Sequence, residues 1–261
     1  MNILFIGDVT GKAGVGYLSE ALLRLRREER LDLVVANAEN AAWNGRGLTE
    51  NALEDLYDAG VEMVTLGNHA WDQKEIYDRL DSDLRVCRPA NFHPNTPGRG
   101  HLLCDVQGKK VAIISLIGRV YMGSYACPFE TAERMVAELR KVTPFILVDF
   151  HAEVTSEKLA LGWHLAGKVS AVVGTHTHVQ TADERILPGG TAYITDVGMT
   201  GPRDGIIGLK KEPMIRKFIQ QMPTKHELEE GARQFSAALI TIADTGQATA
   251  IKRFSFIEGE A

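Results

Sequence analysis

The sequence is poor in cysteine and contains no long apolar run. Its three cysteines are odd in number and show no CxxC spacing, so neither a disulfide framework nor a thiolate zinc site is indicated. We expect Cys87, Cys104 and Cys127 to serve as small buried apolar side chains. No stretch approaches the roughly 18 apolar residues of a membrane span, and the N-terminus shows neither a basic segment nor a small-residue cleavage site. We therefore expect a cytoplasmic protein with no membrane partner.

An excess of positive charge is also lacking. Lysine and arginine number 29 against 34 aspartates and glutamates, which gives a formal net charge of −5. This balance argues against an extended surface for duplex nucleic acid but allows a small phosphate-bearing ligand. With 261 residues, 44% of them hydrophobic, the chain can bury a sizeable core without a metal. A metal site would therefore serve a chemical reaction, since the fold does not need it for stability.

Apolar runs of strand length alternate with helical patterns along the chain. Val15, Leu18, Leu22 and Leu25 share one helical face, and Thr49 is placed to cap a second helix that ends near Gly60. Further helices are expected at 131–141 and 156–166. Strand-length runs that end in polar residues lie at 2–7, 31–36, 61–66, 145–149, 170–173 and 191–194. This alternation predicts buried, mostly parallel sheets that bind ligands beyond the carboxyl ends of their strands.

Two segments have a different pattern. Residues 100–116 and 234–258 each contain two strand patterns joined by a short turn, at Gln107-Gly108 and Thr245-Gly246, as in antiparallel hairpins. Together with the parallel elements they predict an α/β protein in which two mixed sheets pack face to face between flanking helices. Since no repeat or linker is apparent, we expect a single domain over residues 1–261.

Polar residues at the predicted strand ends form a metal-binding pattern. His176-Thr-His178 places two imidazoles on the same side just past a strand, where they can reach two neighbouring metal ions. Carboxylate and amide oxygens together with imidazole nitrogens suit hard metals, and a pair of metals usually needs a bridging carboxylate, for which Glu39 is the best candidate. Further ligand candidates at the strand ends are Asp8, Asn40, Asn68 and His151. Helix or turn capping is the alternative for Asp8, Glu39 and Asn40.

Other motifs carry less information. Gly11 to Gly16 reverses the glycine order of a dinucleotide-binding turn, and the sequence has neither a nucleotide triphosphatase P-loop nor a serine-hydrolase elbow. The segment from Gly118 to Tyr125 mixes one cation with two aromatics. It suits contacts with a phosphate and a base, although an ordinary surface loop explains it equally well.

The ordered motifs resemble those of the YmdB-like family of bacterial calcineurin-like metallophosphoesterases, described as 2′,3′-cyclic-nucleotide 2′-phosphodiesterases. The resemblance covers almost the whole chain. It rests on Gly7-Asp8-Val9, residues 37–42, Leu66-Gly-Asn-His69, His151, Gly174-Thr-His-Thr-His178 and residues 196–202. Thr10 stands where the wider superfamily has a histidine, and Glu39 where it has an aspartate. Both departures fit the YmdB-like pattern and leave only the ligand field in doubt.

The resemblance implies a metallophosphoesterase fold with two metal ions. It assigns Asp8, Glu39, Asn40 and His178 to one metal, and Glu39, Asn68, His151 and His176 to the other. It also suggests iron, with manganese as a common substitute, while the mixed nitrogen and oxygen set does not exclude zinc.

His69 is left without a metal in this scheme, and we expect it to act as general acid. Two metals would lower the pKa of a bridging water, whose hydroxide attacks phosphorus while His69 protonates the leaving sugar oxygen. The resemblance implies that the substrate is a nucleoside 2′,3′-cyclic phosphate opened to the 3′-phosphate. A general phosphodiesterase or phosphomonoesterase, or a regulatory metalloprotein that senses a cyclic nucleotide or an RNA end, are the alternatives. Homo-oligomerisation stays open.

Overall fold

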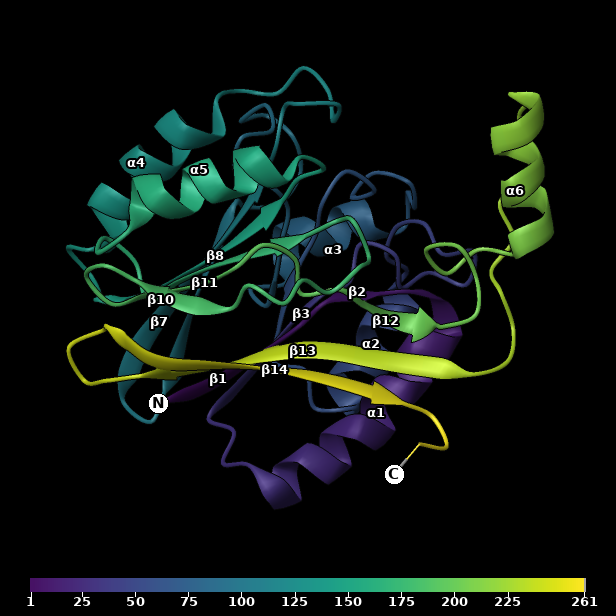
Figure 1. Cartoon of the computed structure of the whole chain (residues 1–261). Coiled ribbons are helices and arrows are strands. Elements are labelled where there is room, and N and C mark those ends of the chain that lie inside the picture. The colour runs from purple at the N-terminus through teal and green to yellow at the C-terminus, as the bar shows by residue number, and fades with distance from the viewer. Residues whose placement is uncertain (261) are drawn as a thin grey trace.

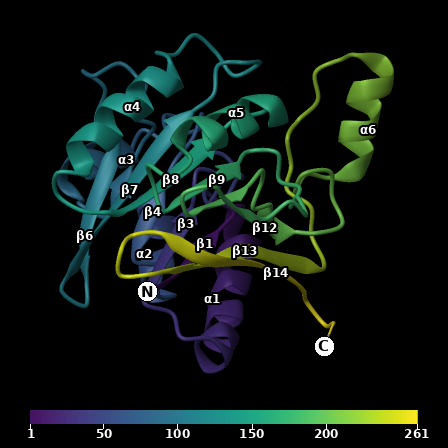
Figure 2. The ribbon, with the colours of Figure 1, turned by 60° about the vertical axis from the view of Figure 1, so that its left-hand side comes forward.

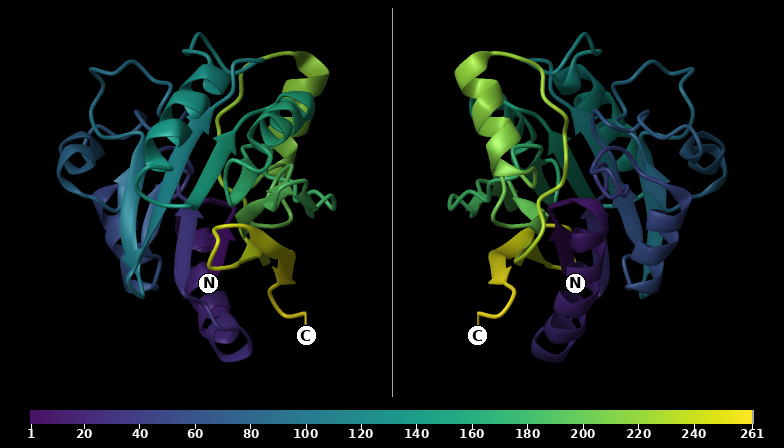
Figure 3. Two further views of the ribbon diagram at one scale, coloured as in Figure 1. Left: turned by 90° about the vertical axis from the view of Figure 1, so that its left-hand side faces the viewer. Right: turned by 90° about the vertical axis from the view of Figure 1, so that its right-hand side faces the viewer.

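The structure, a computed structural model, describes residues 1–260 as two β-sheets stacked face to face with helices on both outer sides (Figures 1 and 2). This arrangement confirms the predicted class, an α/β protein with two packed mixed sheets. Figure 3 shows both termini on the same side of the molecule, far from the helix that projects at the opposite end.

The first sheet has eight strands in the order β2-β12-β13-β1-β3-β4-β5, with β14 paired to β13. Its centre is mixed, because β1 pairs parallel with β3 and antiparallel with β13. Phe5 of β1 lies opposite Val35 on one side and Ala238 on the other. The strands are β1 (Asn2–Ile6), β2 (Asp8–Val9), β3 (Leu33–Asn37), β4 (Met63–Thr65), β5 (Val86–Cys87), β12 (Met199–Pro202), β13 (Arg233–Ile242) and β14 (Ala248–Ile257).

The second sheet has six strands in the order β10-β11-β9-β8-β7-β6. Strands β7, β8, β9 and β11 are parallel, while β6 joins β7 as the predicted hairpin with its turn at Gln107-Gly108. The strands are β6 (His101–Val106), β7 (Lys109–Ile117), β8 (Phe145–His151), β9 (Ala171–Thr175), β10 (Arg185–Leu187) and β11 (Thr191–Ile194). In both sheets the parallel strands therefore end at one edge.

Six helices accompany the sheets: α1 (Gly11–Glu28), α2 (Glu50–Asp58), α3 (Ile76–Ser82), α4 (Pro128–Leu139), α5 (Thr155–Leu165) and α6 (Lys211–Gln220). The predicted helices are confirmed to within a few residues. Thr49 caps α2 by accepting the amide of Ala52 at 3.2 Å, and Gly60 follows the helix with φ +97°. Helices α3 and α6 were not predicted. Helix α3 has only seven residues, too few to show a periodic apolar stripe, and α6 buries only Met214, while its other apolar side chains are exposed.

Three apolar layers hold the elements together. One lies between the first sheet and α1, α2 and α3, the second between the two sheets, and the third between the second sheet and α4 and α5. Because the central strands are covered on both faces, they are apolar throughout, and Ile3, Leu4, Phe5 and Ile6 are all fully buried. The sheets can then tolerate polar groups mainly where the strands end.

The glycines near the start of α1 have a packing role. A Cβ at Gly14 would lie 2.4 Å from the carbonyl oxygen of Thr200, so only glycine lets α1 approach β12 this closely. This contact accounts for part of the Gly11 to Gly16 motif without a dinucleotide.

The expected burial of the cysteines is confirmed for Cys87 alone, because Cys104 and Cys127 are each partly exposed. All three cysteines have free thiols, Cys87 is buried, and burial raises the pKa of the half-buried Cys104 to about 11. Among residues 1–260, no helix is both long and apolar enough to cross a bilayer.

Candidate metal centre

The predicted ligand residues lie where the strands of both sheets end. Asp8 begins β2, immediately after β1. Glu39 and Asn40 follow β3, and Asn68 and His69 follow β4. From the second sheet, His151 ends β8, while His176 and His178 follow β9. The two sheets thus supply oxygen and nitrogen ligands to one region from opposite sides.

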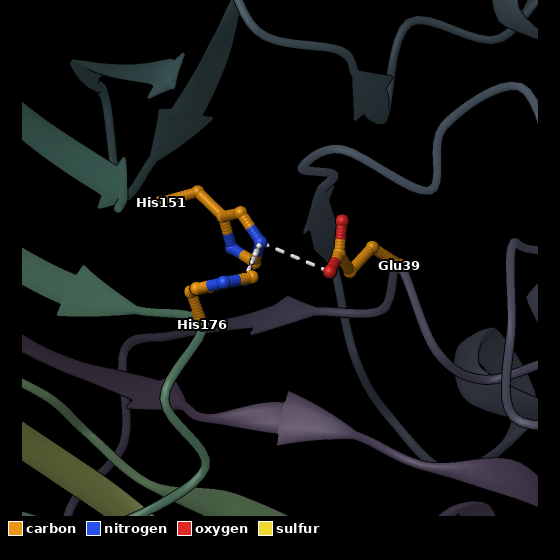
Figure 4. Close-up of side chains that lie close together, drawn as sticks. All are labelled: Glu39, His151 and His176. Carbon is orange, nitrogen blue, oxygen red and sulfur yellow. Dashed lines mark hydrogen bonds and ion pairs between the residues drawn. The ribbon is translucent and has the colours of Figure 1, made fainter. Parts of the chain in front are cut away.

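His151 is the centre of this cluster (Figure 4). Its Nε2 lies 2.9 Å from Glu39 Oε1, 3.0 Å from Asn68 Oδ1 and 3.0 Å from His176 Nδ1. One ligand atom each from Glu39, His151 and His176 lies within 4.8 Å of the others, a spacing suited to a metal ion. Asn68 adds an amide oxygen at the same point.

The electrostatics of this cluster favour a cation. Burial opposes charge on Glu39 and His151, but their mutual attraction outweighs it, lowering the pKa of Glu39 to about 2 and raising that of His151 to about 9. Burial and the neighbouring His151 lower the pKa of His176 to about 3. Three acceptor atoms, from Glu39, Asn68 and His176, therefore face a single ring N–H. A metal ion in place of that proton would satisfy all four groups.

A second group of ligand atoms adjoins the first. His178 Nδ1 lies 3.0 Å from the carbonyl oxygen of Ile207, to which it donates a hydrogen bond. His178 Nε2 then accepts a hydrogen bond from the side-chain amide of Asn40 at 3.2 Å. Asp8 is fully buried, and burial raises its pKa. Its Oδ2 accepts the His176 amide at 3.0 Å, whereas Oδ1 has no hydrogen-bond partner among residues 1–260. A buried carboxylate oxygen without a donor fits a cation as its missing partner.

Backbone conformation also keeps space free in this region. A Cβ at Gly67 would lie 2.4 Å from both Glu39 Oε2 and His151 Nε2, so no other residue fits there without moving the cluster. His176 and His178 have φ values of 104° and 65°, a backbone conformation that residues other than glycine rarely adopt. Such strain is common at functional sites, where the surrounding structure holds it in place.

A buried network orients His151 from behind. Its Nδ1 lies 2.9 Å from Thr175 Oγ1, which donates to Asp149 at 2.7 Å, while Asn37 and Thr65 donate to the other oxygen of Asp149. Burial raises the pKa of Asp149 to about 6 despite these donors. The roles of Asp149 and Thr175 were not predicted from the sequence. The available signal was the position of Asp149 two residues before His151, on the same face of β8.

The loop between the two histidines is held by a buried ion pair. Lys158 Nζ lies 2.6 Å from Asp196 Oδ2, and both side chains are almost completely buried. The same carboxylate accepts the amide and hydroxyl of Thr177 at 3.1 and 2.8 Å and the amide of Gly198 at 2.8 Å. Asp196 thereby fixes the position of both His176 and His178.

His69 lies beside the cluster without joining it. Its backbone amide donates to Glu39 Oε2 at 2.9 Å, and its Nδ1 lies 2.9 Å from Asp72, which also pairs with Arg46 at 2.9 Å. His69 also lines a cavity of about 370 Å³, together with Glu39, Asn40, His176 and His178. Asp72, Arg46 and Glu153 were not predicted as site residues. Glu153 Oε2 lies 3.2 Å from His176 Nε2.

Comparison with known proteins extends these observations. A family model described as YmdB-like protein matches residues 4–254. A 2′,3′-cyclic-nucleotide 2′-phosphodiesterase from Bacillus subtilis strain 168 is 49% identical, covering 97% of this chain and 96% of the relative. A crystal structure of a novel phosphatase from Mycoplasma pneumoniae is 34% identical with a TM-score of 0.93, covering 98% of this chain and 93% of that one.

A more distant structure shares the fold alone. The NAD nucleotidase of Haemophilus influenzae is 13% identical with a TM-score of 0.64. The match covers 98% of this chain and 56% of that protein. The two-sheet architecture is therefore also found in enzymes of distant sequence.

Removing Lys158 should destabilise the protein. In Lys158→Met, Asp196 would remain buried without its cation, and the expected loss in unfolding free energy is about 3–5 kcal/mol. Urea denaturation measures this loss. Lys168→Met is the control, because Lys168 is half exposed and its nearest carboxylate is 3.9 Å away. Equal stabilities of the two variants would contradict the role given to the buried pair.

A methyl group at position 67 should prevent metal binding. Gly67→Ala places a Cβ against Glu39 and His151, so we expect at least a tenfold drop in metal affinity with the two-sheet fold retained. Elemental analysis and circular dichroism measure the two properties. Gly16→Ala is a suitable control, since its new Cβ would meet nothing closer than Arg233 Nη1 at 3.4 Å. Full metal content in Gly67→Ala would contradict the placement of a metal ion between Glu39 and His151.

Proposed function

The chain belongs to the YmdB-like protein family, and from this premise we propose that it is a dinuclear metal-dependent phosphodiesterase that opens nucleoside 2′,3′-cyclic phosphates to 3′-phosphates. The observation that carries the proposal is the meeting of Glu39, Asn68 and His176 at a single nitrogen of His151. Three acceptors around one proton make a poor hydrogen-bonding arrangement and a good set of metal ligands.

The ligand atoms divide into two adjacent sets, with Glu39 common to both. His151, His176 and Asn68 would hold one metal with Glu39. Asp8, Asn40 and His178 would hold the other, supported by the unpartnered oxygen of Asp8. When bound, the metals supply Lewis acidity toward phosphoryl oxygens and an activated water as nucleophile. Iron is the metal we propose, with manganese as a substitute.

His69 is the proposed proton donor to the leaving 2′ oxygen. Its Nδ1 is held by Asp72, so Nε2 is available toward the cavity beside the metal ligands. Histidine suits this task because its ordinary pKa lies close to neutral pH. The contact between Asp72 and Arg46 fixes the orientation of the carboxylate that orients the ring.

The cavity has room for a small nucleotide. Its volume is about 370 Å³, and its lining includes the apolar residues Ile207, Leu209 and Leu228 beside the ligand residues. Apolar lining residues suit a base or ribose face, while the metals would take the phosphate. The fit is to a small phosphodiester rather than to a duplex, in keeping with the net charge of −5.

The test combines metal analysis with product identification. Purified protein is analysed for bound metals and incubated with 2′,3′-cyclic AMP and a panel of other phosphoesters, and the products are separated by chromatography. We expect 3′-AMP, and no product after chelation until metal is restored. Recovery of 2′-AMP would overturn the proposed regiochemistry. Cleavage of monoesters alone would favour a phosphomonoesterase, and tight binding without product would favour a sensor.

Replacement of His69 should separate metal binding from turnover. His69→Ala is expected to keep its metals, because only its backbone amide contacts Glu39, and to lose about 10²–10⁴-fold in kcat. His93→Ala, in a loop of the same chain outside the cavity lining, is the matched control. Wild-type turnover by His69→Ala on a substrate with an alkoxide leaving group would refute the assignment.

A further inference from the structure

Two basic side chains line the cavity beside the metal centre without being metal ligands. They are Arg46 and His226, and both are exposed to solvent. His226 has no part in the proton transfer proposed above, and the guanidinium of Arg46 is a permanent charge. A cation and an imidazole next to a phosphate-binding centre indicate a site for a further anion.

A chain of contacts places Arg46 beyond His69, away from the metal ligands. The backbone amide of His69 donates to Glu39 at 2.9 Å. The ring of His69 lies 2.9 Å from Asp72, and the same carboxylate oxygen lies 2.9 Å from Arg46 Nε. Because His69 is the proposed proton donor to the leaving sugar oxygen, Arg46 lies on the side of the leaving nucleoside.

Arg46 is held in place and still has donors to offer. Its backbone amide donates to the side chain of Asn44 at 3.1 Å, and its carbonyl accepts the side-chain amide of Gln73 at 2.8 Å. Its contact with Asp72 is made by Nε, and no hydrogen bond among residues 1–260 uses its two terminal amino groups. A guanidinium with free terminal donors can bind a phosphate through two parallel hydrogen bonds.

His226 reaches the cavity from the segment that runs from α6 back to β13 (Figure 1). Leu228 anchors this segment. A Cβ on Gly45 would lie 2.6 Å from Leu228 Cδ2, and a Cβ on Gly11 would lie 2.4 Å from Leu228 Cδ1. Since Gly45 directly precedes Arg46, this anchor holds the segment of His226 against the loop of Arg46.

The surroundings of His226 are positive. Burial lowers the pKa of His226, and the nearby charges of Lys217 and Arg46 lower it further. The ring is then neutral at pH 7 and offers one N–H, which has no partner among residues 1–260. The two carboxylates in the cavity lining, Glu39 and Glu153, each contact a histidine of the metal centre. An anion beside His226 would therefore meet donors and positive charge.

We propose that Arg46 and His226 bind a second phosphate, which is carried on the 5′ oxygen of the nucleotide whose cyclic phosphate is opened. This inference rests on the proposed function. The 5′ carbon and the cyclic phosphate are attached to different sides of the ribose ring, so a nucleotide with its cyclic phosphate at the metals directs its 5′ oxygen away from them. Arg46 supplies the charge and His226 supplies an N–H donor. The substrate is then a 5′-phosphorylated nucleoside 2′,3′-cyclic phosphate, either free or as the last nucleotide of a short single-stranded RNA.

The test compares substrates that differ only at the 5′ oxygen. They are 2′,3′-cyclic AMP, its 5′-phosphorylated form, and the dinucleotide ApA with a 2′,3′-cyclic phosphate end. We expect a KM at least about fivefold lower when a 5′ phosphate is present. A gain for the dinucleotide supports the proposal with an RNA end as the source, and a gain for the 5′-phosphorylated mononucleotide alone supports it with a free nucleotide. Equal KM values for all three would overturn the proposal and leave the proposed function standing.

Substitutions connect this preference to the two residues. Arg46→Gln and His226→Ala should each remove most of it, whereas Arg46→Lys should keep part of it because the charge remains. A fall in kcat that is equal for all three substrates reports on Asp72 and His69, so the readout is the ratio of KM values. Arg24→Gln is the matched control, since Arg24 is also 49% exposed and pairs through Nε with a carboxylate at 2.9 Å, but lies outside the cavity lining. An unchanged ratio in both Arg46→Gln and His226→Ala would overturn the proposal.

Product binding gives a readout that needs no turnover. Titration calorimetry compares adenosine 3′,5′-bisphosphate with 3′-AMP, and we expect the bisphosphate to bind at least about fivefold more tightly to the wild-type protein and to Arg24→Gln. Arg46→Gln should lose this difference. If 2′,3′-cyclic AMP is not cleaved, the proposed function fails, and the same comparison still decides the inference, because equal affinities for the two products would overturn it.

Discussion

The contact between His151 and Glu39 joins the two sheets at their common edge. His151 ends a strand of the second sheet and Glu39 follows a strand of the first, and their side chains meet at 2.9 Å in a region closed to solvent. Asn37 and Thr65 of the first sheet extend this seam by donating to Asp149 of the second. Each buried charge would cost several kcal/mol alone, so the cluster persists only because its members face one another.

This seam also explains why strain and tight packing gather nearby. The positive φ values of His176 and His178 and the close approach at Gly67 would destabilise an ordinary loop. Here the buried pair of Lys158 and Asp196 holds the histidine loop from outside, through the amide and hydroxyl of Thr177. The apolar layers between and around the sheets provide the stability that this polar region lacks.

Much of the fold could be predicted because its signals are periodic. The stripe of Leu18, Leu22 and Leu25 marks α1, and the apolar runs before Glu39 and His151 mark strands covered on both faces. Parallel strands end together, so residues after them could be grouped without a structure. The metal assignments themselves remain proposals, although Glu39, Asn68, His151 and His176 do gather at one point.

Other features left no periodic trace. Asp149 and Thr175 are polar residues within apolar strands, and their partnership with His151 depends on the register of β8 and β9. Lys158 and Asp196 are 38 positions apart in the sequence, and no local sequence pattern predicts that they pair. Each of these depends on contacts between segments that the sequence alone does not align.

The place of β13 in the first sheet has a consequence for synthesis on the ribosome. Strand β13 pairs with β1, β12 and β14. At the end of β13, the carbonyl of Ile242 accepts a hydrogen bond from the Met1 ammonium. All the ligand residues discussed above have been made by residue 178, yet the edge of β1 stays unpaired until β13 emerges. A nascent or truncated chain therefore carries its full ligand set on an unfinished sheet, with an open edge able to pair with other chains.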